Sequence, residues 1–311
     1  MRKITALLLI LLALAAAGTL LIRHQQQPVA VAGTGCIDIP ASPDYLSTNS
    51  EADAIAAIDN AHAQEKLPPL RLPANYYHLE PPKQQLILLN FERTDRGLLP
   101  LEMDATLSQM ALGYSRQLFN LHFFSHTSPI SGTFTNRMEN NPATANLYSL
   151  AAENLAGNPA AGAGPIYEYM YDDAAEGCGH RLNILDPELN LVGINWVRGG
   201  QYGSISAQEF LASAGWNLYT HPSPDTIAPY VIAGQPLLKG SLLSCRVLTG
   251  DDVGVVRITW FLDRVDNLPY PGPAWTLDVS HLSPGRHTLL VYAVDGALNY
   301  SMASCTFSIK S

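Results

Sequence analysis

The sequence has few charged residues, and basic residues are the scarcer kind. Charged residues make up 14% of the 311 positions, with 18 Lys and Arg against 27 Asp and Glu. Arg2, Lys3 and Arg23 flank an apolar segment at the N-terminus, so the rest of the chain is more acidic than the net charge of −9 indicates. Such a chain repels phosphate groups, which makes nucleic acid a poor partner. Hydrophobic residues reach 47%, which excludes wholesale disorder, and the length is that of about two domains.

Two local signatures of catalysis are absent. No Gly-x-Ser-x-Gly sequence presents a serine nucleophile, and adjacency alone does not make Ser125 the partner of His126. The nine histidines include no pair four apart on one helix, because the helix that carries His122 is expected to end before His126. Any catalytic or metal site must therefore be assembled from separate segments.

The N-terminus predicts export. Residues 4–22 form an uncharged apolar run after Arg2 and Lys3, close to the ~20 residues that cross a bilayer as a helix. We interpret residues 1–22 as an uncleaved membrane anchor or a signal peptide, with lipid attachment at Cys36 as a third alternative. The anchor and signal interpretations place the remainder outside the cytoplasm, because the positive end stays inside.

Prolines are frequent in residues 23–82, including Pro28, Pro40, Pro43 and the pairs at 68–69 and 81–82. This composition predicts a spacer that holds the following domain away from the membrane. One short helix, over residues 51–66, is expected to interrupt it.

The periodicity of residues 83–220 predicts helices packed on an antiparallel sheet. Apolar residues recur at helical spacing in residues 83–93, 104–122 and 165–174, with Asp104 as an N-cap. Residues 191–196 and 205–216 alternate with period two, as strands do. This order of elements indicates an α+β domain. The prolines and polar residues at 221–225 then mark a domain boundary.

Residues 225–311 predict a second, all-β domain. Turns that contain Gly, Pro and Asp separate six short apolar segments, at residues 230–233, 241–248, 255–262, 274–279, 287–295 and 303–309. We expect a small β-sandwich with Trp260 and Tyr292 in its core.

Four cysteines in an exported chain raise the question of pairing. Cys245 and Cys305 lie on the apolar faces of two predicted strands, so we expect either a disulfide across the core or two buried thiols. Cys36 and Cys178 are left, and the sequence leaves their pairing open.

Three polar residues stand in sequences that resemble a known family. These are His126 in Phe124-Ser125-His126, Glu153 in Ala152-Glu153-Asn154-Leu155-Ala156, and His180 in Gly179-His180-Arg181-Leu182-Asn183-Ile184-Leu185. Together with Asn90-Phe91-Glu92-Arg93 and Gly97-Leu98, they resemble the bacterial branch of the CAP superfamily, which includes cysteine-rich secretory proteins, insect venom antigens and plant pathogenesis-related proteins. The resemblance covers about residues 83–218.

The resemblance implies an α-β-α sandwich with an open cleft lined by two histidines and two acidic residues. His126, Glu153 and His180 match three of these positions, and Asp172, three residues after Tyr169, is the candidate for the fourth. The chain departs from the common bacterial form by an insertion of residues 173–178 before Gly179. Asn90 and Arg93 match the first helical motif, where we expect them to pin the helix to neighbouring loops.

The cleft residues suggest either a metal site or a hydrogen-bonded wall. His126 and His180 are candidate ligands of a divalent metal, with Zn²⁺ the first choice, and Glu153 or Asp172 would then act as a base or orient a ligand. Alternatively, imidazoles and carboxylates only hydrogen-bond one another. We predict a protein that binds a lipid, glycan or peptide; a metal-dependent hydrolase and an adhesin-like role are the alternatives.

Two loops of the second domain, at residues 250–256 and 292–299, resemble those of bacterial immunoglobulin-like modules. Their carboxylates, from Asp251, Asp252 and Asp295, are of the kind that binds Ca²⁺. Ordinary turn chemistry explains Asp and Gly at these positions as well. By analogy of fold, such a module spaces or adheres rather than catalyses.

Overall fold

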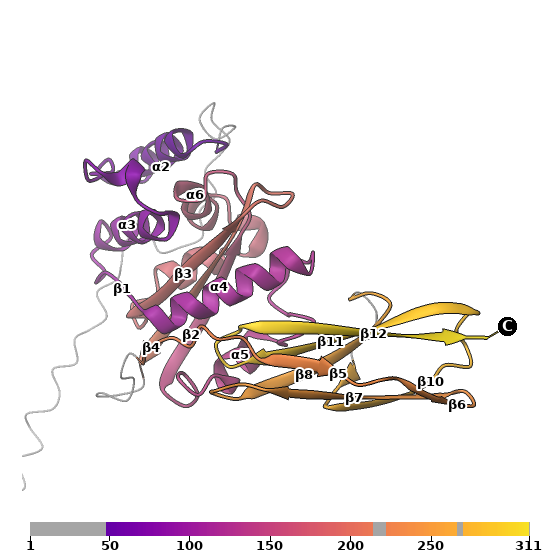
Figure 1. The fold of residues 1–311 in the computed structure, drawn as a ribbon. Coiled ribbons are helices and arrows are strands. Elements are labelled where there is room, and N and C mark those ends of the chain that lie inside the picture. The colour runs from indigo at the N-terminus through magenta and orange to yellow at the C-terminus, as the bar shows by residue number, and fades with distance from the viewer. Residues whose placement is uncertain (1–47, 214–221, 266–269, 311) are drawn as a thin grey trace, which may run out of the picture. The chain divides into compact units, whose positions relative to one another are not determined.

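The structure is a computed structural model that describes residues 48–213, 222–265 and 270–310 (Figure 1). The predicted anchor or signal peptide and Cys36 lie outside these residues. None of the described helices has both the length and the apolar character needed to cross a bilayer.

A four-stranded sheet with helices on both faces forms the first domain. Its strands lie in the order β1-β3-β4-β2, and they are β1 (Glu102–Met103), β2 (Tyr148–Ala156), β3 (Leu191–Arg198) and β4 (Ser204–Ser213). Strand β1 runs parallel to β3, and the other neighbours are antiparallel. Figure 1 shows α4 (Ala105–Asn120) on one side of the sheet and α3 (Pro81–Thr94) and α6 (Ala163–Tyr171) on another. This is the expected α-β-α arrangement.

Helix α4 follows from its sequence. The Asp104 side chain accepts a hydrogen bond from the amide of Leu107, as a helix N-cap does. The stripe at three- and four-residue spacing is fully buried or nearly so, and comprises Leu107, Met110, Ala111, Tyr114 and Leu118. The helix ends at Asn120, and His122 follows with φ of 54°. The prediction that the helix stops before His126 is confirmed.

Of the predicted spacer, residues 23–82, the structure describes residues 48–82; they include the predicted helix, and the spacer role stays a prediction. Helix α2 (Glu51–Glu65) ends one residue before the predicted end at Lys66, it packs against α6, and a short 3-10 helix, η1 (Tyr76–His78), follows it. His62 is fully buried and its Nε2 lies 3.1 Å from Glu92 Oε1 of α3. Composition alone could not reveal these contacts, because the partners of α2 lie far along the chain.

Arg93 pins α3 to neighbouring loops, as predicted. Its guanidinium is buried and donates to four backbone carbonyls, those of Leu99, Ile184, Asp186 and Leu189, at 2.7 to 3.1 Å. Asn90 exchanges two hydrogen bonds with the backbone of Leu101. Both residues therefore have structural roles.

Two four-stranded sheets make up the C-terminal region. One contains β10 (Ala274–Asp278), β7 (Leu242–Gly250), β5 (Tyr230–Ala233) and β6 (Leu237–Lys239); the other contains β12 (Tyr300–Ile309), β11 (Gly285–Asp295), β8 (Val255–Leu262) and β9 (Tyr270–Pro271). All six predicted strands are present, and Trp260 and Tyr292 are buried. The immunoglobulin-like assignment remains a prediction.

Of the two alternatives predicted for Cys245 and Cys305, a disulfide or two thiols, the structure has two free thiols. Their sulfur atoms lie 3.7 Å apart, because β7 and β12 each present an apolar face with its cysteine to one core. Cys178 is buried and disulfide-bonded. Cys36, whose pairing with Cys178 the sequence left open, lies outside the described part of the chain.

Candidate functional site

A cleft of about 640 Å³ brings the sequence-predicted residues together. His126, Glu153, Asp172 and His180 all line it, although they come from four separate segments. The wall also includes the aromatic residues Phe124, Tyr169 and Tyr202, and two acids, Glu168 and Asp173. Its size lies within the range of small-molecule sites in proteins.

His126 is held at the cleft by a buried carboxylate. Its Nδ1 lies 2.7 Å from Glu153 Oε1, and the Glu153 side chain is 1% exposed against 53% for His126. Because an ionised carboxylate can only accept, Nδ1 carries the proton and Nε2 is left with its lone pair. Arg137, in α5 (Phe134–Asn140), donates to the other Glu153 oxygen and to the His126 carbonyl.

His180 repeats this arrangement with Asp173. Its Nδ1 lies 2.6 Å from Asp173 Oδ1, and the second oxygen of Asp173 accepts from the amide of Arg181. His180 lies in α7 (Gly179–Ile184), after the 3-10 helix η2 (Ala174–Glu176). The predicted acid, Asp172, also lines the cleft, but its neighbour Asp173 is the residue that contacts His180. The inserted residues 173–178 hid this assignment from the sequence analysis.

The two imidazoles face the same space. Their ring centroids lie 6.3 Å apart with planes 35° from each other, and Tyr169 packs 5.2 Å from the His180 ring. Two imidazoles on one Zn²⁺ have centroids roughly 5–6 Å apart at Zn–N of ~2.0–2.1 Å, so a small movement would suffice. Among the described residues, no three His, Cys, Asp or Glu ligand atoms of the cleft all lie within 4.8 Å of one another.

Glu168 is a cleft residue that the sequence analysis missed. Burial, with the charge of Asp172 adding to it, raises the pKa of Glu168 to about 7 against the opposing hydrogen bond from Asn158. A carboxyl group with that pKa can exchange a proton near neutral pH. The missed signal is a lone acid among the apolar residues of α6, a helix otherwise almost wholly buried.

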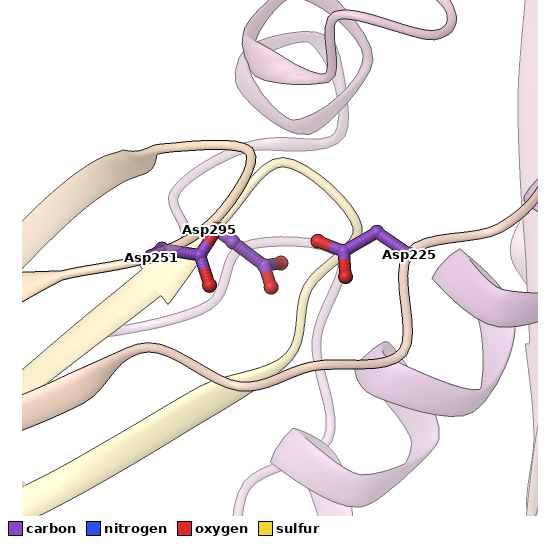
Figure 2. Close-up of side chains that lie close together, drawn as sticks. All are labelled: Asp225, Asp251 and Asp295. Atoms are coloured by element: carbon purple, nitrogen blue, oxygen red, sulfur yellow. The ribbon is translucent and has the colours of Figure 1, made fainter.

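Three aspartates of the C-terminal region form a second acidic cluster. One carboxylate oxygen from each of Asp225, Asp251 and Asp295 lies within 4.8 Å of the others, and Figure 2 shows the three side chains gathered together. Each also makes the expected turn contacts; Asp251, for example, accepts from the amides of Val253 and Gly254. Asp252, the third acid of the sequence prediction, is not in the cluster, and the calcium interpretation remains a prediction.

Asp295 should make the stability of the protein depend on pH. Burial, together with the charges of Asp225 and Asp251, raises the pKa of Asp295 to about 7. The raised pKa means that protonated Asp295 stabilises the folded state. This contribution to the free energy of unfolding is fully present below the pKa of Asp295 in the unfolded chain, about 4, and it is lost as the pH rises through about 7. From pH 5 to pH 8 the free energy of unfolding should therefore fall by about 2 kcal/mol more in the wild type than in Asp295→Asn.

Urea denaturation of both proteins at the two pH values measures this difference. Parallel pH profiles would contradict the prediction. Calcium chloride at the higher pH adds a second readout: it should raise the Tm of the wild type and leave Asp295→Asn unchanged, if the sequence-based calcium interpretation is right.

Comparison with known proteins points to one family for the first domain. Residues 86–212 match the model of the Cysteine-rich secretory protein family, CAP. The chain is 32% identical over 129 residues to the uncharacterized protein YkwD of Bacillus subtilis, covering 42% of this chain and 46% of that protein. It is 29% identical to the uncharacterized membrane protein YlbC of the same organism, covering 36% of this chain and 30% of that protein.

A solved structure is also similar. It is that of an extracellular protein containing a SCP domain from Bacillus anthracis, with 27% identity, a TM-score of 0.36, and coverage of 46% of this chain and 44% of that one. The chain spans less than half the length of the curated relatives it matches. The family match and the bacterial relatives together support assignment of residues 86–212 to the CAP family.

Proposed function

We propose that this protein works outside the cytoplasm of a bacterium and binds a ligand in the cleft of its CAP domain. The observation that carries the proposal is the pair of imidazoles, His126 and His180, each fixed through Nδ1 by a buried carboxylate at the wall of the cleft. Both Nε2 atoms are thereby kept as acceptors. The sequence-predicted export segment at residues 1–22 supports the location.

The lining favours a neutral or cationic ligand over an anionic one. Four carboxyl groups line the cleft, those of Glu153, Glu168, Asp172 and Asp173, and no Lys or Arg is among its lining residues in the described part of the chain. Phe124 and Tyr202, both exposed, meet edge to face at 5.3 Å and offer an apolar surface for a ring or an aliphatic group. Of the predicted ligand classes, a glycan or peptide suits this chemistry better than a fatty acid.

A divalent metal on His126 and His180 is part of the proposal. Neutral imidazoles are common ligands of Zn²⁺, and the carboxylates that hold Nδ1 orient such ligands in other metal sites. With two protein ligands, the metal would keep positions for water and for a bound ligand. Bound there, it would supply Lewis acidity, and Glu168 could exchange a proton beside it.

Calorimetric titration with zinc chloride tests the metal. We expect micromolar binding by the wild type and its loss in His126→Ala and in His180→Ala, because each variant removes one of two ligands. His281→Ala is the control, since His281 is exposed and lies outside the cleft. If both cleft variants are folded and still bind zinc, the two imidazoles are not metal ligands and serve only in the hydrogen bonds of the cleft wall.

Ligand binding is measured separately. The probes are a chitooligosaccharide, a lysine-containing tetrapeptide and palmitate, each titrated with and without a chelator and against Phe124→Ala. Saturable binding of the first or second that is weakened by Phe124→Ala supports the proposal. Binding of palmitate alone would contradict it, and metal-dependent cleavage of a probe would favour the hydrolase alternative.

A further inference from the structure

A second carboxyl group lies in the sheet beside Glu153. Glu209 of β4 is fully buried and stands opposite Glu153 of β2 in antiparallel register. Residues paired in this way point to the same face of the sheet with Cβ atoms ~4.5–5.5 Å apart. Unlike Glu153, Glu209 is not among the residues that line the cleft.

Both carboxyl oxygens of Glu209 are buried, and among the described residues no N–H or O–H group donates to either of them. Those of Glu153 are both engaged, one by His126 and the other by Arg137. On the other side of Glu209, the paired residue of β3 is Gly193, which offers no side chain. A buried carboxyl group without a donor is costly if it is ionised, so this one needs an explanation.

The charged groups around Glu209 provide that explanation. The charged and titratable groups that face it are Glu153 from β2, Arg137 from α5 and Tyr114 from α4. If both glutamates were ionised, the single positive charge of Arg137 would face two buried negative charges. A protonated carboxyl group instead has an O–H that can donate to the neighbouring carboxylate. In agreement, burial first, and then the charge of Glu153, raises the pKa of Glu209 well above its usual range.

We propose that Glu209 is a neutral carboxylic acid that hydrogen-bonds Glu153 from within the sheet and so positions the Glu153 carboxylate toward His126. Arg137 and Glu209 then hold Glu153 from two sides, and His126 presents one fixed tautomer to the cleft. Glu209 acts through Glu153 and touches no ligand, so it is a positioning residue. Its role in the cleft rests on the proposed function, whereas its protonation can be measured without any ligand.

Carbon NMR of protein labelled at the glutamate side-chain carboxyl carbons tests the protonation. One signal should keep the chemical shift of a protonated acid from about pH 5 to pH 8 and should be missing in Glu209→Gln. Glu168 serves as an internal comparison, because its signal should titrate within that range and vanish in Glu168→Gln. If every wild-type glutamate is ionised at the upper pH, the proposal is wrong, whatever the variants do.

The positioning role has its own readout. Nitrogen NMR of labelled histidine, with a chelator present, reports which ring nitrogen of His126 carries the proton. The wild type and Glu209→Gln, whose amide can still donate to Glu153, should both show the Nδ1–H tautomer. Glu209→Met, which cannot donate, should show a mixture of tautomers. Identical spectra for Glu209→Gln and Glu209→Met would overturn the positioning role, and so would loss of the Nδ1–H tautomer in Glu209→Gln.

These results separate the two proposals. A protonated Glu209 in a protein that binds neither zinc nor any probe would contradict the proposed function and leave this inference standing. Zinc binding by a protein with an ionised Glu209 would contradict this inference and leave the proposed function standing.

Discussion

Arg137→Met is expected to destabilise the protein by about 3–5 kcal/mol, because it removes the cation that faces two buried acids. The guanidinium is wholly buried, donates to Glu153 and lies 3.6 Å over the ring of Tyr114. It also donates to the carbonyls of His126 and Gly132, each at 3.0 Å. Methionine fills much of the space but replaces none of these donors.

Urea denaturation at neutral pH measures the loss, and two variants make it interpretable. Arg198→Met is the control, because Arg198 is exposed and stacks on Trp196; its effect should stay within about 0.5 kcal/mol. Adding Glu153→Gln to Arg137→Met should recover part of the stability, since it removes the uncompensated charge. A loss below about 1 kcal/mol in Arg137→Met would contradict the electrostatic account of this site.

Gly193→Ala is expected to cost at least about 3 kcal/mol, the upper end for overpacking. A Cβ at this position of β3 would lie 2.0 Å from the carbonyl carbon of Leu107 and 2.2 Å from the amide nitrogen of Ser108. These are backbone atoms of α4, so no side chain can rotate away and the helix itself must shift. Glu209 is the residue paired with Gly193 on β4, so the shift would also loosen the packing beside the cleft.

Gly179→Ala is the matched control for Gly193→Ala. Gly179 is the first residue of α7, and a Cβ there would meet nothing within 4 Å. Its stability should be unchanged or higher by up to about 1 kcal/mol, since alanine loses less entropy in a helix. The difference in Tm between the two variants is the measurement. Equal Tm values would mean that α4 lies farther from the sheet than the structure places it.

Local patterns were sufficient for elements with strong periodicity. The stripe and N-cap of α4 identified that helix, and turns that contain Gly, Pro and Asp between short apolar segments identified all six predicted strands of the C-terminal region. Strand β2 was missed because its centre, Leu150-Ala151-Ala152, lacks the β-branched and aromatic residues that mark strands. The 3-10 turn η2 and helix α7 were missed because each is shorter than two helical turns.

The residues of the candidate site also fall into two groups, those that local sequence predicted and those that it did not. The motifs around His126, Glu153 and His180 resemble one family in one order, so the sequence predicted that these three residues belong together. The contact of Asp173 with His180, the place of Glu168 in the cleft wall and the pairing of Glu209 with Glu153 became known from the three-dimensional fold. These are relations between residues on different strands, helices and loops, and neither periodicity nor local motifs carry information about such pairings. For the same reason the sequence predicted helix α2 but not its packing, in which the buried His62 contacts Glu92, thirty residues away.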